Sequence, residues 1–172
     1  MPVRTSVANI KILKAEPDDR PAIQEIASTI WHEHYPGIIT QRQIVYMLAL
    51  DYSLEAMNKD LAAGISMDML IVGEKLAGFA AYGPTGHEEV IKLHKLYLLQ
   101  SFHGQGLGSM FLAHVEHECI EQGFKSIVLN VNKNNHSAIK TYRRNGYINQ
   151  ESVLADIGGG FFMDDYVMAK DL

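Results

Sequence analysis

Hydrophobic residues along the chain follow two spacings, which together predict a mixture of strands and helices. Short apolar and alternating runs predict strands at 10–13, 67–72, 76–82, 89–99, 126–131, 147–157 and 161–169. Apolar positions three and four residues apart predict a helix from 17–19 to about 31, and others after 40, between 53 and 64, from 107 to 123 and over 135–145.

The same spacing predicts which helix faces are buried and where the helices begin and end. Thr40 and Ser53 are predicted N-caps, and Gly123 is a predicted helix terminator. The expected inward residues of the helix after Thr40 are Ile44, Val45, Leu48 and Leu50. Those of the helix after residue 106 are Leu107, Phe111, Leu112, Val115, Cys119 and Ile120.

The resulting order of elements is β-α-α-(α)-β-β-β-α-β-α-β-β, with a short third helix as an option, which predicts a fold of mixed α/β class. A chain of 172 residues has the usual length of one domain. We expect a single domain over 1–172, with 1–8 as a loose N-terminal lead-in.

Composition and charge narrow the class of protein. Hydrophobic residues make up 47% and charged residues 20% of the chain, as in ordinary globular proteins. Apolar runs fall short of the roughly 20 residues that cross a bilayer, so we expect no membrane partner. The single cysteine, Cys119, fits a reducing cytoplasm. The net charge of −5 disfavours nucleic acid as a partner and mildly favours a cationic acceptor.

Three glycines alternate between a predicted strand and a predicted helix, in the run His103-Gly104-Gln105-Gly106-Leu107-Gly108-Ser109. Glycines let a ligand approach the backbone closely, and the free amides of a helix start attract phosphate. A P-loop would need a lysine after its last glycine, and a dinucleotide-binding loop would follow the first strand. Binding of NAD or ATP is therefore disfavoured.

A second stretch, Asn135-His136-Ser137-Ala138-Ile139-Lys140-Thr141-Tyr142, strengthens the remaining alternative. Together with 96–109, it resembles the acetyl-CoA-binding core of the GCN5-related N-acetyltransferase (GNAT) family. The segment 92–98 is most similar to the bacterial spermidine/spermine acetyltransferase (PaiA-like) branch. The resemblance implies a central mixed, mostly antiparallel sheet, flanked by helices and splayed between parallel strands near 89–99 and 126–131.

The resemblance also implies how acetyl-CoA is held. The main chain of Leu96, Tyr97 and Leu98 would bind the pantetheine arm, and amides of 103–108 would bind the pyrophosphate. Asn135 would contact the cofactor, Lys140 and Arg143 could reach its adenosine phosphates, and Tyr142 would be the general acid. The implied cofactor-binding residues are Leu96, Tyr97, Leu98, His103, Gly104, Gln105, Gly106, Leu107, Gly108, Ser109, Asn135, Lys140 and Tyr142.

His103 departs from the family pattern, which has glutamine or arginine at this position. Because phosphate favours a protonated imidazole, we expect a contact at His103 to weaken as pH rises through about 6–8.

The residue that accepts the ammonium proton is left open by the sequence. Glu33 and His32 lie at the end of the first predicted helix, and His94 lies on the central predicted strand. A water chain is a further alternative. Asp164, Asp165 and Tyr166 on the last predicted strand are also placed to face an acceptor, and the turn 158–160 is a candidate gate.

These observations predict an acetyl-CoA-dependent N-acetyltransferase that transfers acetyl directly to a primary amine. The favoured acceptor is a polyamine or other small amine. The alternatives are a protein or peptide amine, and a coenzyme A-binding sensor without turnover. The histidine spacings lack a zinc-hydrolase pattern, so we expect no metal. A homodimer is implied by the family resemblance alone.

Overall fold

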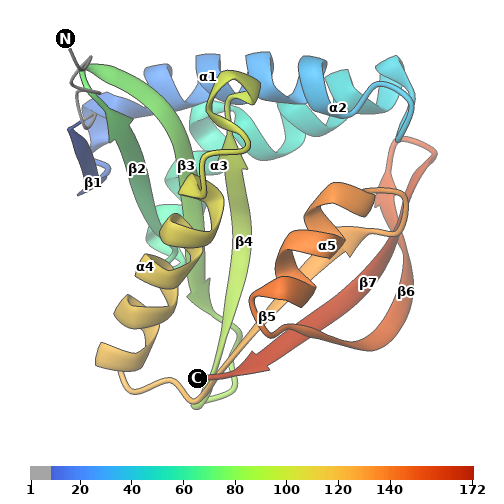
Figure 1. The fold of residues 1–172 in the computed structure, drawn as a ribbon. Helices are drawn as coiled ribbons and strands as arrows, with labels where there is room; N and C mark the ends of the chain where they lie inside the picture. Colours follow the sequence, from blue (N-terminus) through green and yellow to red (C-terminus); the bar gives the residue numbers. More distant parts are fainter. Residues whose placement is uncertain (1–8) are drawn as a thin grey trace, which may run out of the picture.

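The computed structural model describes residues 9–172, so the expected lead-in at 1–8 lies outside the described residues. A seven-stranded sheet has the order β1-β2-β3-β4-β5-β7-β6 (Figure 1). The elements are β1 (Ile10–Lys14), the 3-10 turn η1 (Pro17–Asp19), α1 (Arg20–His34), α2 (Gln41–Tyr52), α3 (Leu54–Ala62), β2 (Ser66–Val72), β3 (Lys75–Pro84), β4 (Val90–Leu98), η2 (Gln100–Phe102), α4 (Leu107–Glu121), β5 (Ser126–Asn132), α5 (His136–Arg144), β6 (Ile148–Gly158) and β7 (Phe161–Asp171). The predicted order of elements is confirmed.

Strands β4 and β5 form the parallel pair of the sheet, and they separate partway along their length. Their pairing runs from Val90 opposite Ser126 to Leu93 opposite Leu129. Beyond Leu93, β4 continues to Leu98 without β5, and Figure 1 shows the two strands diverging there. The predicted mixed sheet with a splay between two parallel strands is confirmed.

A β-bulge in β4 lies where the splay begins. Lys95 is opposite Ala81 of β3 and Leu93 is opposite Tyr82, which leaves His94 as an extra residue. A bulged residue shifts the alternation of side chains between the two faces of a sheet. Lys95 and Tyr97 therefore face α1–α3, whereas the side chain of Leu93 packs in the core beneath α4.

Helices cover both faces of the sheet and create two cores. One core contains α4, with Phe111 and Val115 fully buried, and Ile139 of α5. The other contains Ile23 of α1, Ile44 of α2 and other residues of α1–α3, which pack on β2 and β3. Within residues 9–172, the helices are too short or too polar to cross a membrane.

Helix caps are confirmed, but some predicted inward positions are wrong. Thr40 Oγ1 accepts a hydrogen bond from Gln43 N at 3.2 Å, and Ser53 Oγ accepts one from Ala56 N at 3.1 Å. The side chains of three residues predicted to be buried are largely exposed: Val45 at 55%, Leu50 at 46% and Ile120 at 49%.

The error in α2 has a simple geometric cause. The buried residues of this helix are Gln43, Ile44, Met47 and Tyr52, which follow the three- and four-residue spacing of one face. Val45 and Leu50 lie away from that face. Helix α1 also continues three residues beyond Trp31, to His34, and this extension brings its last turn to the splay.

A buried polar cluster joins the sheet to α4. Asp68 of β2 is buried and accepts hydrogen bonds from Tyr82 Oη of β3 at 2.8 Å and from His114 Nε2 of α4 at 3.1 Å. Buried polar groups stabilise a fold only while they are paired, because an orphaned partner keeps its desolvation penalty.

We therefore expect Asp68→Ala to destabilise the protein by about 3 kcal/mol, because both donors lose their acceptor. Urea unfolding followed by circular dichroism measures this loss. The matched control is Glu74→Ala in the exposed β2–β3 turn, which should change stability by less than about 0.5 kcal/mol. Equal stability of the two variants would show that the cluster is energetically neutral.

Candidate active site

A cavity of about 560 Å³ opens where β4 and β5 diverge. It passes between the layers, so both α1–α2 and α4–α5 contribute to its walls. Its lining includes Trp31, His34, Tyr35, Asp51, Tyr52, Lys92, His94, Leu96, Tyr97, Leu98, His103, Gly104, Gly106, Leu107, Gly108, Ser109, Asn135, Thr141, Tyr142, Arg144 and Asp165. One half carries the glycine loop, and the other carries aromatic and acidic side chains.

The open edge of β4 is formed by alternate main-chain groups. Leu99 N–H donates to Ala77 O of β3 at 2.8 Å. Main-chain groups two residues apart in a strand point to the same side, so Tyr97 also directs its N–H and C=O toward β3. The main-chain N–H and C=O groups of Leu96 and Leu98 therefore point toward the splay. The main chain of Tyr97 is therefore paired with β3, while its side chain lines the cavity, and a contact of Tyr97 with the cofactor stays a prediction.

The glycine loop leaves open space beside its backbone. Gly104 and Gly106 have φ values of 74° and 76°, a region that favours glycine. A Cβ added at Gly104, Gly106 or Gly108 would meet no protein atom within 4 Å. Gly108 has ordinary helical geometry, so the fold itself does not require a glycine there. Gly106 caps α4 without a side-chain hydrogen bond, which leaves the first-turn amides available to an anion.

Other residues of the loop make internal contacts. His103 Nε2 lies 3.0 Å from Leu98 O and, as the partner of a carbonyl, acts as the donor. Ser109 Oγ accepts a hydrogen bond from Asn145 Nδ2 at 3.0 Å. Gln105 donates to Ser101 O at 3.2 Å and lies outside the cavity lining, unlike the other predicted residues of the loop.

Helix α5 brings Asn135 and Tyr142 to the opposite wall of the splay. Asn135 Oδ1 caps the helix through Ala138 N at 3.4 Å and also accepts from His34 Nε2 at 3.0 Å. Burial, followed by the nearby Tyr35, raises the pKa of the Tyr142 phenol, which stays protonated at neutral pH. Lys140 is exposed and outside the lining, whereas Arg144, which the sequence analysis did not select, lies in it.

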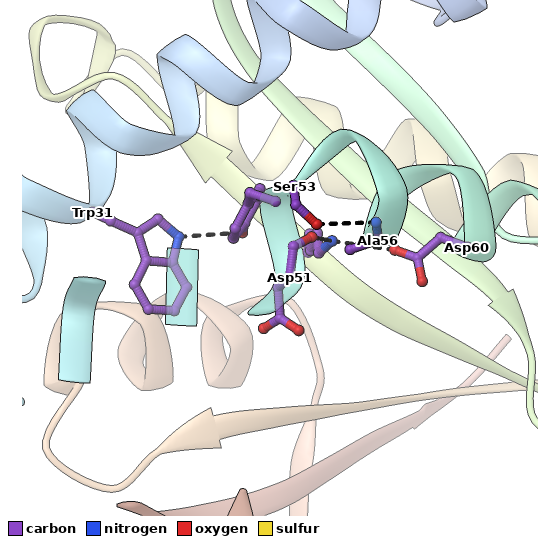
Figure 2. A network of polar contacts seen from close by, with 7 residues as sticks. Trp31, Asp51, Ser53, Ala56 and Asp60 are labelled. Atoms are coloured by element: carbon purple, nitrogen blue, oxygen red, sulfur yellow. Dashed lines mark hydrogen bonds and ion pairs between the residues drawn. The ribbon is translucent and has the colours of Figure 1, made fainter. Parts of the chain in front are cut away.

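Aromatic side chains form one wall of the other half. The ring centroids of Trp31 and Tyr35 are 4.3 Å apart, and those of Trp31 and Tyr52 are 5.8 Å apart. Tyr35 Oη and Tyr97 Oη are hydrogen-bonded at 2.9 Å. Trp31 Nε1 donates to Tyr52 Oη at 3.2 Å, which is the dashed line from the Trp31 ring in Figure 2. Burial raises the pKa of Tyr35 to about 12, so this wall is uncharged at neutral pH.

The candidate bases of the first helix lie outside the cavity. Glu33 and His32 are exposed and absent from the lining, because the helical rotation turns them away from the splay while His34 faces it. His94 at the bulge also lines the cavity. Burial lowers the pKa of both His34 and His94, so these imidazoles are neutral at pH 7.

Two carboxylates face the aromatic half of the cavity, Asp165 of β7 and Asp51 of α2. Asp165 was one of three adjacent candidates, and the other two turn elsewhere. Asp164 pairs with Lys133 at 2.6 Å, and the Tyr166 ring lies 5.6 Å beneath the same ammonium. Asp51 was not selected, since an aspartate near a helix end gives no signal that distinguishes it from a solvated one.

The turn 158–160, a candidate gate, is packed against α2. Tyr46 Oη donates to Ile157 O at 2.7 Å, and a Cβ added at Gly159 would lie 2.7 Å from Tyr46 Cε2. The glycines here permit close packing of two segments of the protein. A role for this turn as a gate stays a prediction.

Comparison with known proteins assigns the family. The model of the acetyltransferase (GNAT) family matches residues 23–147, which include most of α1, the splay, the glycine loop and α5. The chain belongs to the GNAT family. It is therefore an N-acetyltransferase that uses acetyl-CoA as its co-substrate.

Solved structures of GNAT proteins share the fold. PaiA N-acetyltransferase from Thermoplasma acidophilum, in complex with coenzyme A, has a TM-score of 0.81 at 22% identity, covering 95% of this chain and 99% of that one. Ribosomal-protein-S18-alanine N-acetyltransferase from Escherichia coli has a TM-score of 0.72 at 20% identity, covering 95% and 94%. At these identities, the likeness concerns the fold alone.

The residues around the splay fit acetyl-CoA in this GNAT protein. The open space beside Gly108 suits an external group, and the splayed edge of β4 offers the N–H and C=O of Leu96 and the N–H of Leu98, whose C=O already accepts from His103. Within residues 9–172, His, Cys, Asp and Glu form no cluster of three or more that would hold a metal ion.

The space at Gly108 yields a prediction that separates folding from binding. We expect Gly108→Ala to raise the melting temperature slightly, since alanine stabilises a helix by about 0.5–1 kcal/mol over glycine. A bulky side chain in the same space, as in Gly108→Leu, should instead raise the Kd for coenzyme A by about tenfold or more, a difference of about 1.4 kcal/mol. Calorimetry and thermal melting measure the two effects. His117→Ala, on the exposed face of α4, is the control, and unchanged affinity in Gly108→Leu would contradict the binding role.

The buried Asp165 yields a prediction about pH. Burial, with Asp164 as a smaller cause, raises the pKa of its carboxyl above the usual value, while Asn130, Lys92 and Lys133 act in the opposite sense. The Asp165 carboxyl therefore binds a proton more tightly in the folded state than in the unfolded state. The free energy of unfolding then falls as pH rises from the unfolded-state pKa through the folded-state pKa of this carboxyl. Asp165→Asn should raise the melting temperature at pH 7 and lose that advantage toward pH 4.

Thermal melting from pH 7 to pH 4 tests this pH dependence. Asp164→Asn is the matched control, because its exposed carboxylate is paired with Lys133. A gain in melting temperature for Asp165→Asn that is the same at every pH would rule out titration of this carboxyl as its cause.

Proposed function

We propose that this GNAT protein transfers the acetyl group directly from acetyl-CoA to a primary amine of a small molecule, with a polyamine as the favoured acceptor. The observation that carries the proposal is one continuous cavity. It joins the open edge of β4 and the glycine loop to a half lined by Asp51 and Asp165, and Tyr142 lies in its wall.

Each chemical requirement has a candidate group in this proposal. Acetyl-CoA supplies the activated acetyl group. Leu96 N–H faces the splay and donates to the carbonyl oxygen as charge develops there. Tyr142 donates its phenolic proton to the departing sulfur, a role that suits a phenol kept protonated by burial. His103, Asn135 and the loop amides hold the cofactor.

Direct transfer is favoured over an acyl-enzyme by the position of the only thiol. Cys119 is fully buried in the core under α4, away from the cavity lining. Burial raises the pKa of this thiol to about 12, which suppresses the nucleophilic thiolate.

Acceptor choice rests on charge and on resemblance. The net charge of −5, two carboxylates in the cavity and the PaiA-like segment all favour a cationic small amine. The E. coli neighbour named as a ribosomal-protein-alanine N-acetyltransferase makes a protein amine the second candidate. The proposal includes a single domain, a cytoplasmic location and a homodimer, the last from family resemblance.

Tyr142→Phe tests the proton donor. It keeps the ring and removes the hydroxyl, so we expect kcat to fall by about 10²-fold while coenzyme A affinity is unchanged. Release of coenzyme A thiol from acetyl-CoA with spermidine measures the rate. Tyr147→Phe is the matched control, because its hydroxyl donates to Glu116 at 3.0 Å, away from the cavity lining.

A Tyr142→Phe enzyme with the kcat of the unaltered protein would remove Tyr142 from the mechanism. The same assay with amino acids, aminoglycosides and N-terminal peptides ranks the acceptor classes. Binding of coenzyme A without thiol release for any amine would instead identify a sensor.

A further inference from the structure

Building on the proposed function, we infer that the aromatic half of the cavity binds two ammonium groups of one acceptor. Asp165 receives the amine that reacts and accepts its proton, and Asp51 binds a second cation of the same molecule. The preferred acceptor is then a linear diamine or polyamine, and the second charge determines specificity. Contacts and burial of the two carboxylates support this assignment.

Asp165 has an unsatisfied oxygen in the cavity wall. Its side chain is 7% exposed, and Oδ1 has no hydrogen-bond partner among residues 9–172. It lies opposite Asn132 of β5, on the part of that strand that has left β4. Asn130 and the ammonium groups of Lys92 and Lys133 partly stabilise the charged carboxyl, but a buried oxygen without a partner is costly, so an incoming cation is favoured at Oδ1.

Asp165 lies on the side of the cavity where the proposed chemistry occurs. Tyr35 lies close to both Asp165 and Tyr142. The charge of Asp165 raises the pKa of Tyr35, and Tyr35 in turn raises the pKa of Tyr142. The Tyr35 hydroxyl bonds Tyr97, next to the open main-chain edge of Leu96. These relations associate Asp165, rather than Asp51, with the reacting amine.

Asp51 lies at the other end of the aromatic wall. Its main-chain carbonyl accepts a hydrogen bond from Lys95 Nζ at 3.0 Å, and the same ammonium pairs with Asp60 at 3.3 Å. Figure 2 shows the Asp51 carboxylate directed away from Asp60 and Ser53, with no contact drawn to it. Burial, opposed by Lys95, raises the pKa of this carboxyl. Asp51 is therefore a second desolvated acceptor of a positive charge.

The aromatic wall connects the two carboxylates. Tyr35 contacts Trp31, and Trp31 contacts Tyr52, the neighbour of Asp51 along α2. Aromatic faces stabilise both methylene chains and cations. A flexible chain with an ammonium at each end suits this arrangement better than a single amine.

Other charged groups in the cavity do not neutralise both carboxylates. Lys95 is engaged by Asp60 and lies 4.5 Å over the Tyr52 ring. Lys133, outside the lining, is paired with Asp164. Lys92 lines the cavity and partly offsets the burial of Asp165. His34 and His94 carry lowered pKa values and are neutral at pH 7.

The reaction step balances with these groups. The ammonium gives one proton to Asp165 and becomes a free amine, whose lone pair forms the C–N bond as the C–S bond breaks. Tyr142 protonates the departing sulfur, and the second amine proton restores the Tyr142 phenol. Asp165 then returns its proton to solvent. The raised pKa of Asp165 narrows the gap to an ammonium of about 10.4.

Paired acceptors of equal chain length test the inference. We expect kcat/KM for 1,4-diaminobutane to exceed that for 1-aminobutane by about tenfold or more, the size of one charge-assisted hydrogen bond. Asp51→Asn should remove most of this ratio through KM for the diamine. Asp165→Asn should lower kcat with both amines and flatten the acidic limb of the kcat/KM pH profile.

The control is Asp164→Asn, whose paired carboxylate lies next to Asp165 in sequence and should leave the ratio intact. Melting temperatures of all variants with and without spermidine show that they are folded, and the shift produced by spermidine should shrink in Asp51→Asn. A kcat/KM ratio between the diamine and the monoamine near one in the unaltered enzyme, or an unchanged ratio in Asp51→Asn, overturns this inference and leaves the proposed function standing. Failure to acetylate any amine overturns the proposed function with it.

Discussion

The structure depends on an interruption of one strand pair. Parallel strands β4 and β5 stay hydrogen-bonded only to Leu93, and the bulge at His94 turns the rest of β4 away. Unpaired main-chain groups within a fold are costly, so an edge of this kind calls for another partner. The glycine loop directly follows that edge, so in the proposed binding mode one continuous segment presents both strand-like and anion-binding main-chain groups to acetyl-CoA.

The two halves of the cavity differ because different layers supply them. The half that we propose for the cofactor is built from main-chain amides, glycines and the start of α4, which favour negative charge. The half that we propose for the acceptor places Asp51 and Asp165 around neutral aromatic rings, which favours positive charge. Both carboxylates are desolvated in the free protein, so the acceptor half retains destabilising groups. Buried ionisable groups that lower the stability of the free protein are frequent in sites that bind a charged ligand.

Local features of the site were predictable from the sequence, whereas features that depend on tertiary contacts were not. The caps at Thr40 and Ser53, the glycine loop and the element order follow from short-range chemistry. The direction of the Tyr97 main-chain groups depends on the register between β4 and β3. The direction of the Glu33 side chain depends on the residue at which α1 ends and on the face of the helix that packs on the sheet. Asp51 becomes distinctive only after folding buries it beside Tyr52 and Lys95.

Residue-resolved amide hydrogen exchange, with and without coenzyme A, tests the central claim most directly. Binding at the splay should slow exchange at Leu96, Leu98 and the amides of 104–109, while Tyr97, already paired with β3, should change little. Equal protection of Leu96, Tyr97 and Leu98 would contradict the assigned strand edge. Protection confined to another region of the protein would contradict the account as a whole.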